Sequence, residues 1–329
     1  MNDIAVIGAG SWGTTLAILL SDKGYDVSLW AYEEELAEDI KKTRINTVYL
    51  PEFAIPESIK VSHRIEDVVR GAEYILNVVP TQYTRNIFKN VLPYIRENTI
   101  IISASKGIEK GSLLTGSGIL KELSGKEVAV LSGPSFAKEV AKKLPTAVTL
   151  AMNDHNTGLL LQKIFNTDYF RVYTHNDVIG VELGAALKNV IAIASGISDG
   201  LKLGFNARAA LITRGLAEIT RLGVAMGAEE KTFRGLSTLG DLVLTCTGPL
   251  SRNYTVGFKL GLGQKLKDIL STMSMVAEGV TTADAAYQLS KKYKVDMPIV
   301  EQIYKVINDD KNPSDAVKEL MARSLKSEF

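Results

Sequence analysis

The feature that most constrains this chain is a glycine-rich turn that begins at its eighth residue. The apolar run 4–7 predicts a buried strand, the segment Gly8-Ala-Gly10-Ser-Trp-Gly13 follows it, and residues 14–23 have a helical pattern. In such a unit the glycines allow a tight turn, a close approach of the backbone to a pyrophosphate, and close packing of helix on strand. The helix N-terminus adds N–H groups and partial positive charge. We therefore expect Gly8, Gly10 and Gly13 to bind a nicotinamide dinucleotide.

The choice between NAD and NADP depends on the end of the second predicted strand, about 20 residues past the turn. Tyr32 and Glu33 stand there. A carboxylate accepts hydrogen bonds from a free 2′-hydroxyl and repels a 2′-phosphate, so Glu33 favours NAD. Lys41, Lys42 and Arg44 follow and can offset this preference, and an acidic run that starts at Glu33 also suits a solvated helix start. The sequence leaves the cofactor open.

The first half of the chain alternates short apolar runs with helical patterns, which predicts a parallel sheet covered by helices on both faces. The expected strands are 4–7, 27–30, 74–79, 99–103, 128–131, 147–150 and 170–173. After Asn176 and Asp177, which suit a helix N-cap, the strand signals stop. We therefore expect an α/β fold: a doubly wound, dinucleotide-binding domain at residues 1–177, and an all-helical, substrate-binding domain at 178–329.

Charge and cysteine content exclude several classes of protein. With 38 basic and 37 acidic residues the formal net charge is +1, so no global field attracts nucleic acid or an anionic membrane. A single cysteine and three scattered histidines make a metal site unexpected. The apolar stretch 178–197 contains Glu182 and Lys188, which favours a buried helix over a membrane span. No signal peptide is visible, so we expect a cytoplasmic protein.

Lys188 is the strongest candidate for acid–base chemistry. It lies in LGAALKNVIAIA, a stretch that is apolar nearly all round and therefore predicted to be buried. A buried ammonium is costly without a partner, and its use in proton transfer to a carbonyl oxygen would explain it. The alternative is a surface helix whose lysine extends into solvent.

A second cluster follows between residues 240 and 253. The spacing of Asp241 and Thr245 puts both on one helical face, where a carboxylate can orient a lysine and a hydroxyl can bond a substrate. After Gly248-Pro249, Ser251 suits an N-cap, which leaves Arg252 and Asn253 at the head of the next helix. A guanidinium beside free N–H groups can clamp a phosphate, although Arg252 also suits an ordinary salt bridge.

Two further turns follow predicted strands. Lys106 comes after strand 99–103, and Gly133 and Ser135 come after strand 128–131. Ligands of open α/β sheets bind outside the carboxyl ends of the strands, so these turns face the same crevice as the glycine turn. Lys106 alone also suits a solvated turn.

Taken together, these residues resemble NAD(P)-dependent glycerol-3-phosphate dehydrogenase, which interconverts dihydroxyacetone phosphate and sn-glycerol 3-phosphate. The resemblance runs almost end to end, through GAGSWGTTLA, Asn46 with Tyr49-Leu-Pro51, SASKGIE, LSGPSFAKEV, AALKNVIAIASGISDGL and GDLVLTCTGPLSRN. It implies that Lys188 is the proton donor and acceptor, with Asp241 beside it. The implied substrate contacts are Lys106, Gly133, Ser135, Arg252 and Asn253, with Ser251 close by. The implied cofactor contacts are Ser11, Trp12, Lys106, Ala137, Arg252, Val276 and Glu278.

The resemblance further implies a Rossmann-type first domain, a cytoplasmic homodimer without stable membrane insertion, and a supply of glycerol phosphate for phospholipids. Many bacterial members resemble NADPH users with basic residues where this chain has Tyr32 and Glu33, so NADP use is in doubt. Two alternatives stay open from the residues alone. One is a hydroxyacid dehydrogenase that pairs a dinucleotide domain with a Lys-Asn helix, and the other is a redox sensor that binds NADH without consuming it.

Overall fold

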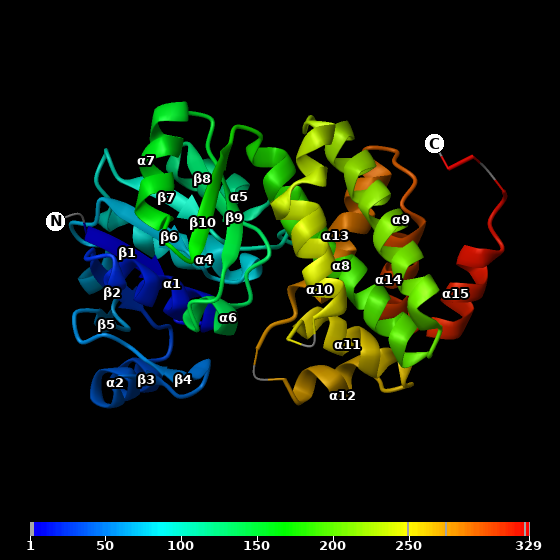
Figure 1. The fold of residues 1–329 in the computed structure, drawn as a ribbon, viewed down its shortest axis with the longest axis horizontal. Coiled ribbons are helices and arrows are strands. Elements are labelled where there is room, and N and C mark those ends of the chain that lie inside the picture. The colour runs from blue at the N-terminus through cyan, green and yellow to red at the C-terminus, as the bar shows by residue number, and fades with distance from the viewer. Residues whose placement is uncertain (1–2, 249, 274, 326, 329) are drawn as a thin grey trace. The chain divides into compact units, whose positions relative to one another are not determined.

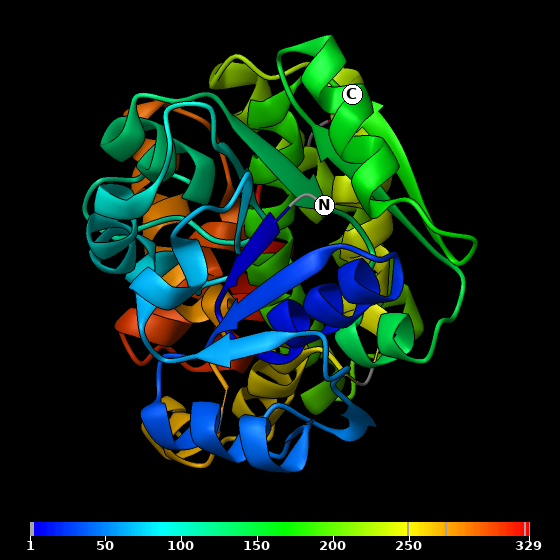
Figure 2. The ribbon, with the colours of Figure 1, turned by 90° about the vertical axis from the view of Figure 1, so that its left-hand side faces the viewer.

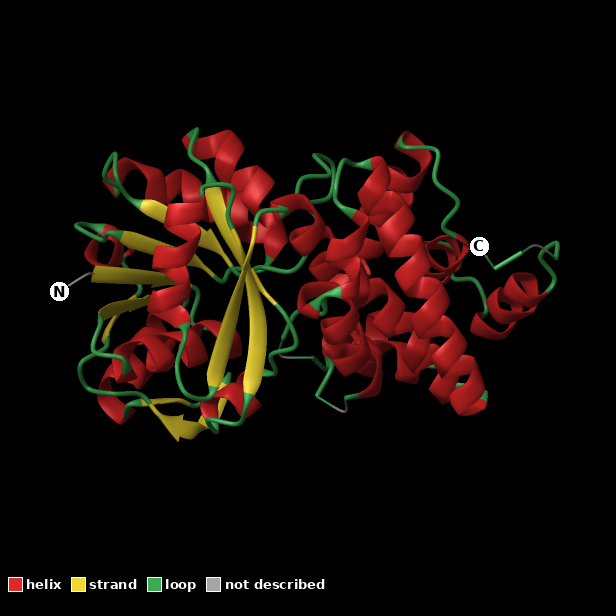
Figure 3. Ribbon diagram, turned by 45° about the horizontal axis from the view of Figure 1, so that its top comes forward, coloured by secondary structure: helices red, strands yellow, loops and turns green. Residues whose placement is uncertain are grey.

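A computed structural model describes residues 3–248, 250–273, 275–325 and 327–328. These residues form two compact units. The first contains residues 3–106 and 114–182, and the second contains residues 107–113 together with the described residues from 183 onward. Figure 1 follows the chain through both units, and Figure 3 shows that the described strands belong to the first.

An eight-stranded sheet forms the centre of the first unit. Its strand order is β10-β9-β8-β7-β6-β1-β2-β5. Their bounds are β1 Asp3–Ile7, β2 Asp26–Trp30, β5 Lys60–Ser62, β6 Tyr74–Asn77, β7 Ile100–Ser103, β8 Val128–Ser132, β9 Thr146–Ala151 and β10 Phe170–His175. The seven strands expected from the apolar runs are therefore confirmed. Because β1 lies between β2 and β6, successive crossovers leave it in opposite directions, as in a doubly wound fold.

One pairing differs from the expected parallel sheet. β8 and β9 pair antiparallel, with Leu131 opposite Leu150, whereas β9 and β10 pair parallel to each other. A parallel return usually runs through a full helix that crosses the face of the sheet. Only the five-residue helix α6 (Ala137–Ala141) stands between β8 and β9, so the chain turns back and the sheet is mixed.

Helices cover both faces of this sheet (Figure 2). The helices of the first unit are α1 Ser11–Asp22, α2 Glu34–Thr43, α3 Ile65–Val69, α4 Thr81–Val91, η1 Leu92–Tyr94, α5 Gly116–Ser124, α6 and α7 His155–Phe165. Strand residues alternate between two cores. Val6 faces a core shared with α1, α2, α6 and α7, while Ile7 faces a core shared with α3, α4 and α5. This alternation sends successive strand side chains to the two cores on opposite faces of the sheet.

Three short strands were not expected from the sequence. β3 (Ile45–Asn46) and β4 (Leu50–Ala54) form an antiparallel pair, and β5 lies at the edge of the main sheet. β3 and β5 have two and three residues, too few for alternation to be visible. β4 has five residues but contains Pro51, which breaks a strand pattern and is typical of an exposed edge. The β3–β4 pair nevertheless matters, because it packs beside the glycine turn.

The second unit is helical in its described residues. Its elements are the part of α8 (Val178–Gly200) from Leu183 onward, α9 Gly204–Ala225, η2 Glu230–Arg234, the π-helix η3 Leu236–Gly240, α10 Asp241–Thr247, α11 Arg252–Gly261, α12 Leu266–Ser271, α13 Glu278–Lys292, α14 Pro298–Asn308 and α15 Pro313–Met321. Their apolar faces share one core, to which the α8 residues Leu187 and Ile191 contribute.

The helix α8 begins where the N-cap pair predicted it. The Asp177 carboxylate accepts a hydrogen bond from Gly180 N at 2.8 Å. Length and composition would allow α8 to cross a membrane, but 89% of its most apolar window is buried inside the protein. This burial favours the core helix that the internal charges predicted.

Candidate functional site

The glycine turn joins β1 to α1, and each glycine meets a different steric limit. Gly8 has φ +119, and a Cβ there would lie 3.1 Å from the Val78 carbonyl oxygen. A Cβ at Gly13 would lie 1.8 Å from the Gly8 carbonyl oxygen, so helix and turn can approach only without a side chain. At Gly10 a Cβ would meet nothing within 4 Å. The turn is therefore closed beneath Gly8 and Gly13 and open above Gly10, as a pyrophosphate cradle requires.

The first turn of α1 adds polar groups at the same place. An α-helix leaves its first N–H groups without intrahelical partners, and α1 starts at Ser11 with Gly10 as its N-cap. Trp12 Nε1 is buried and has no hydrogen-bond partner within the described residues. The Ser11 hydroxyl donates to the Tyr49 carbonyl at 2.7 Å. Such an N-terminus with an unpaired buried donor suits an anionic ligand.

Asn46 holds the glycine turn in place, a role that sequence reasoning missed. Its side chain is fully buried. The amide nitrogen donates to Ala9 O at 2.8 Å and to Thr14 Oγ1 at 2.9 Å, and its oxygen accepts from Tyr49 N at 3.0 Å. Asn46 belongs to the quoted family blocks, but its contacts span 37 residues, and no local pattern shows that reach.

The proposed ribose-selecting residues lie next to the β3–β4 pair. Tyr32 follows β2 and is 73% exposed, and Glu33 is the N-cap residue of α2. Burial raises the pKa of Tyr49, and the Glu33 carboxylate raises it further. Because Tyr49 also bonds Ser11, Glu33 stands on the side of the first unit that carries the glycine turn.

Lys106, Gly133 and Ser135 come together at the carboxyl ends of β7 and β8. The Gly133 carbonyl accepts from Lys106 Nζ at 2.9 Å and from Ser135 Oγ at 3.0 Å. Gly133 has φ +149, and a Cβ there would lie 2.8 Å from Val148 Cα. Ala137 begins α6, and its carbonyl accepts from Thr15 of α1 at 3.2 Å. These sequence-predicted residues therefore belong to one end of the sheet.

In the second unit, Lys188 is almost fully buried. It is 6% exposed, and its ammonium donates to Asp241 Oδ1 at 2.9 Å and to Thr245 Oγ1 at 2.6 Å. Asp241 and Thr245 are 2% and 3% exposed. The Thr245 hydroxyl also lies 2.6 Å from the Asp241 carbonyl oxygen. The ammonium is thus compensated by a carboxylate and oriented by a hydroxyl, as a buried charge requires.

The neighbouring thiol takes no part in this chemistry. Cys246 is buried, and burial raises the pKa of its thiol to about 12. A thiol in this state stays protonated at neutral pH and is a poor nucleophile. Among the described residues, no three His, Cys, Asp or Glu side chains gather where they could hold a metal ion.

A second polar group surrounds the head of α11. Ser251 caps this helix by accepting from Tyr254 N at 3.2 Å, which confirms the expected N-cap. Arg252 donates to the Val276 carbonyl at 3.1 Å. Burial lowers the pKa of the Arg252 guanidinium, while the nearby Glu278 carboxylate raises it. The guanidinium therefore lies beside the free end of a helix, in a partly desolvated position.

Asn253 is tied to the fold more tightly than its sequence position suggested. Its amide nitrogen donates to Asn189 Oδ1 at 2.8 Å, and its oxygen accepts from Gly279 N at 2.9 Å. Both asparagines are buried. Asn189, directly after Lys188, was not among the predicted site residues, because its partner lies 64 residues away. Pro249 of the quoted motif lies outside the described residues.

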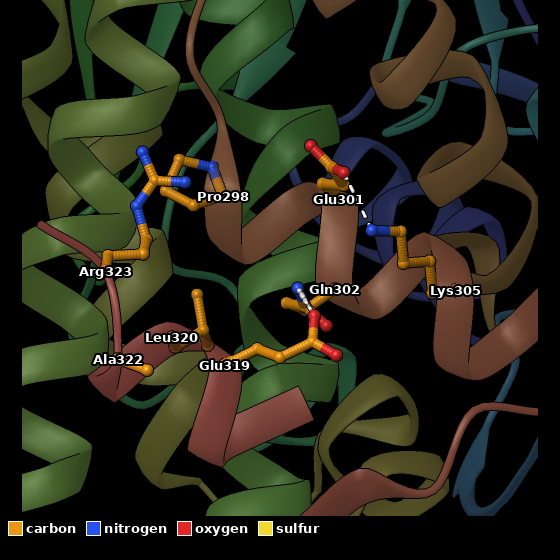
Figure 4. A pocket seen from close by; sticks show the side chains of 8 residues that line it. All are labelled: Pro298, Glu301, Gln302, Lys305, Glu319, Leu320, Ala322 and Arg323. Atoms are coloured by element: carbon orange, nitrogen blue, oxygen red, sulfur yellow. Dashed lines mark hydrogen bonds and ion pairs between the residues drawn. The ribbon is translucent and has the colours of Figure 1, made fainter. Parts of the chain in front are cut away.

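One pocket of the second unit lies elsewhere, between α14 and α15 (Figure 4). Its lining contains none of the sequence-predicted site residues and consists of Pro298, Glu301, Gln302, Lys305, Glu319, Leu320, Ala322 and Arg323. Lys305 pairs with Glu301 at 2.8 Å, and Gln302 donates to Glu319 at 3.0 Å. Lys305 and Glu301 pair within this lining, whereas Arg323 pairs with Asp296 and Glu319 pairs with Lys311, both outside it. The candidate groups therefore stay those predicted from the sequence, the glycine turn in the first unit and the groups around Lys188 and Arg252 in the second.

Two family models cover nearly the whole chain. Residues 3–158 match the model described as NAD-dependent glycerol-3-phosphate dehydrogenase N-terminus, and residues 177–318 match the corresponding C-terminus. Two similar proteins are named glycerol-3-phosphate dehydrogenase, with NAD(P)+ as cofactor. The one from Syntrophotalea carbinolica is 55% identical over 99% of both chains, and the one from Geobacter sulfurreducens is 53% identical over 99% of this chain and 98% of its own length.

A solved structure of a glycerol-3-phosphate dehydrogenase is also similar to this chain over nearly its whole length. The crystal structure of glycerol-3-phosphate dehydrogenase from Coxiella burnetii superposes with a TM-score of 0.95 at 42% identity, covering 98% of this chain and 99% of its own.

Proposed function

Because the chain belongs to the family of NAD-dependent glycerol-3-phosphate dehydrogenases, we propose a division of labour among its residues for the reaction of that family. The enzyme interconverts dihydroxyacetone phosphate and sn-glycerol 3-phosphate with NAD(P)H. The observation that carries the proposal is the Lys188 ammonium, 6% exposed and bonded to Asp241 and Thr245. Residues 1–177 hold most of the dinucleotide, and residues 178–329 hold most of the substrate.

Lys188 gives its proton to the substrate oxygen during reduction. When bound, the nicotinamide supplies a hydride to the ketone carbon, and negative charge then develops on the oxygen. A positioned ammonium neutralises that charge and donates a proton, which completes the hydroxyl group. In the oxidation direction the neutral amine takes the proton back. The Asp241 carboxylate compensates the ammonium, and both Asp241 and Thr245 fix its direction.

The groups that bind the substrate phosphate lie at the N-terminus of α11 and in the turn after β7. Arg252 offers a guanidinium beside the N–H groups of a ten-residue helix, which together suit a phosphate. Asn253 and its partner Asn189 keep this end of α11 in register with α8. Lys106, held against Gly133 O, supplies a second cation for substrate, with Ser135 next to it.

The dinucleotide is held by the glycine turn and by residues around it. Gly8, Gly10 and Gly13 form the cradle, and we expect Ser11, Trp12 and Lys106 to contact the cofactor as well. Ala137, Arg252, Val276 and Glu278 complete the expected contacts. Glu33 and Tyr32 stand where the adenosine ribose is read, and the Glu33 carboxylate favours NADH over NADPH.

The proposed cellular setting rests on the resemblance to the family. We propose that the protein works in the cytoplasm as a homodimer, without membrane insertion, and that its product supplies the glycerol phosphate of phospholipids. Size-exclusion chromatography with light scattering tests the dimer, which a monomeric mass at micromolar concentration would contradict.

The experiment that tests the reaction follows nicotinamide absorbance with NADH and NADPH in parallel. Dihydroxyacetone phosphate should cause rapid oxidation, while short keto acids, the substrates of hydroxyacid dehydrogenases, should not. NADH should be the better donor. Oxidation with keto acids but not with dihydroxyacetone phosphate would contradict the proposed substrate.

A further inference from the structure

The helix α8 packs closely on the π-helix η3 next to the Lys188–Asp241 pair. Gly184 lies one turn before Lys188 on α8, and Thr238 lies one turn before Asp241. Both are buried, and they face each other. The Gly184–Thr238 contact and the Lys188–Asp241 pair are therefore successive contacts of α8, the first with η3 and the second with the start of α10.

The contact at Gly184 leaves no room for a side chain. A Cβ at this position would lie 1.8 Å from Thr238 Oγ1, 2.8 Å from Thr238 Cβ and 3.0 Å from Thr238 Cγ2. Rotation of Thr238 can move the first and third atoms, but its Cβ is fixed to the backbone. Carbon atoms in contact prefer about 3.5 Å or more, so any residue larger than glycine pushes the two elements apart by about 0.7 Å.

Thr238 contributes shape and not a hydrogen bond. Its side chain is completely buried, and its hydroxyl has no partner within the described residues. A buried hydroxyl without a partner is unfavourable for folding. The Thr238 side chain instead fills the space on α8 that the missing side chain of Gly184 leaves open.

We propose that Gly184 and Thr238 are positioning residues, which let η3 approach α8 closely enough for Lys188 to reach both Asp241 and Thr245. The inference rests on the proposed role of Lys188. The wider turn of a π-helix, common at functional sites, brings Thr238 against Gly184 and then delivers Asp241 as the first residue of α10.

The main test is Gly184→Ala. Displacement of a catalytic group by about 1 Å can cost roughly a hundredfold in rate, so we expect kcat to fall at least about tenfold. KM should change much less, because Arg252 and Lys106 are untouched. Adding Thr238→Gly removes all three contacts, including the one with Thr238 Cβ, so the double variant should be faster than Gly184→Ala alone.

The control is Gly261→Ala, at a glycine of α11 that packs tightly against α8. A Cβ there would lie 2.6 Å from Ile197 O, nine residues beyond Lys188. It should lower the unfolding midpoint in urea as Gly184→Ala does while leaving kcat near the parent value. An equal loss of kcat in both variants would contradict the positioning role and show that Gly184 supports only the stability of the fold.

Two further variants keep the inference testable if Gly184→Ala does not fold. Thr238→Val preserves shape without the hydroxyl and should retain parental kcat and stability, and a large loss of kcat would overturn the proposal. Lys188→Met separates the two hypotheses. If it is active, the role of Lys188 fails. If it is inactive while folded Gly184→Ala is fully active, only the positioning role fails.

Discussion

Removal of the Lys188 ammonium alone should destabilise the protein. Removal of the ammonium together with the Asp241 carboxylate should not. In Lys188→Met the Asp241 carboxylate, 2% exposed, loses its ion pair with the ammonium at 2.9 Å and keeps the Thr245 hydroxyl at 3.2 Å. Breaking a buried pair on one side costs about 3–5 kcal/mol. Because the Thr245 contact remains, we expect about 3 kcal/mol, or roughly a hundredfold in the folding equilibrium.

The double variant Lys188→Met/Asp241→Leu replaces both charges with apolar side chains of similar size. Such replacements are often neutral, so its unfolding free energy should lie within about 1 kcal/mol of the parent. The assay is urea unfolding followed by circular dichroism for the parent, both single variants and the double variant, which forms a double-mutant cycle. Turnover should be lost in the double variant although its stability recovers.

Two results would refute this reasoning. If Lys188→Met changes the unfolding free energy by less than about 0.5 kcal/mol, the size typical of a surface substitution, the ammonium is solvated and not buried. If the losses of the two single variants simply add in the double variant, Lys188 and Asp241 are not coupled.

Three other changes test separate parts of the site and fold. Arg252→Ala should lower kcat/KM for dihydroxyacetone phosphate by about 10- to 100-fold through KM, with little effect on phosphate-free dihydroxyacetone; equal losses would argue against a phosphate clamp. Glu33→Lys should shift the preference between NADH and NADPH toward NADPH by about tenfold in kcat/KM, and an unchanged ratio would remove Glu33 from the ribose site. Glu218 is 1% exposed, and burial raises its pKa from 4.5 to about 7. The folded state then binds the proton more tightly than the unfolded state, so this group should cost roughly 3 kcal/mol of stability as pH rises from about 4.5 to 7. Urea unfolding across this range should show a flatter profile for Glu218→Gln, and parallel profiles would contradict the shift.

Local sequence patterns were enough to predict the strands and the glycine turn. Apolar runs of four or more residues, bounded by turns, located each of the seven longer strands of the main sheet, and the steric roles of Gly8 and Gly13 follow from their spacing. The pattern could not show that β9 runs antiparallel to β8. Strand direction depends on the path of the connection, and the short α6 between them was not predicted as such.

In the candidate site, too, local sequence patterns predicted some side-chain roles and missed those that depend on distant contacts. An apolar helix around Lys188 indicated burial, and the spacing of Asp241 and Thr245 indicated a shared face. The structural roles of Asn46, Asn189 and Thr238 were not predicted, because each acts through a partner more than 35 residues away. Such contacts depend on how the elements pack, which local periodicity does not contain.

The most direct test of the central claim compares turnover with cofactor binding in Lys188→Met. NADH affinity, measured by nicotinamide fluorescence, should stay near the parent value, because the glycine turn belongs to the other unit. Turnover of dihydroxyacetone phosphate should fall by about a thousandfold, within the range that general acid catalysis contributes. Near-parental turnover by a variant that still binds NADH would contradict proton donation by Lys188.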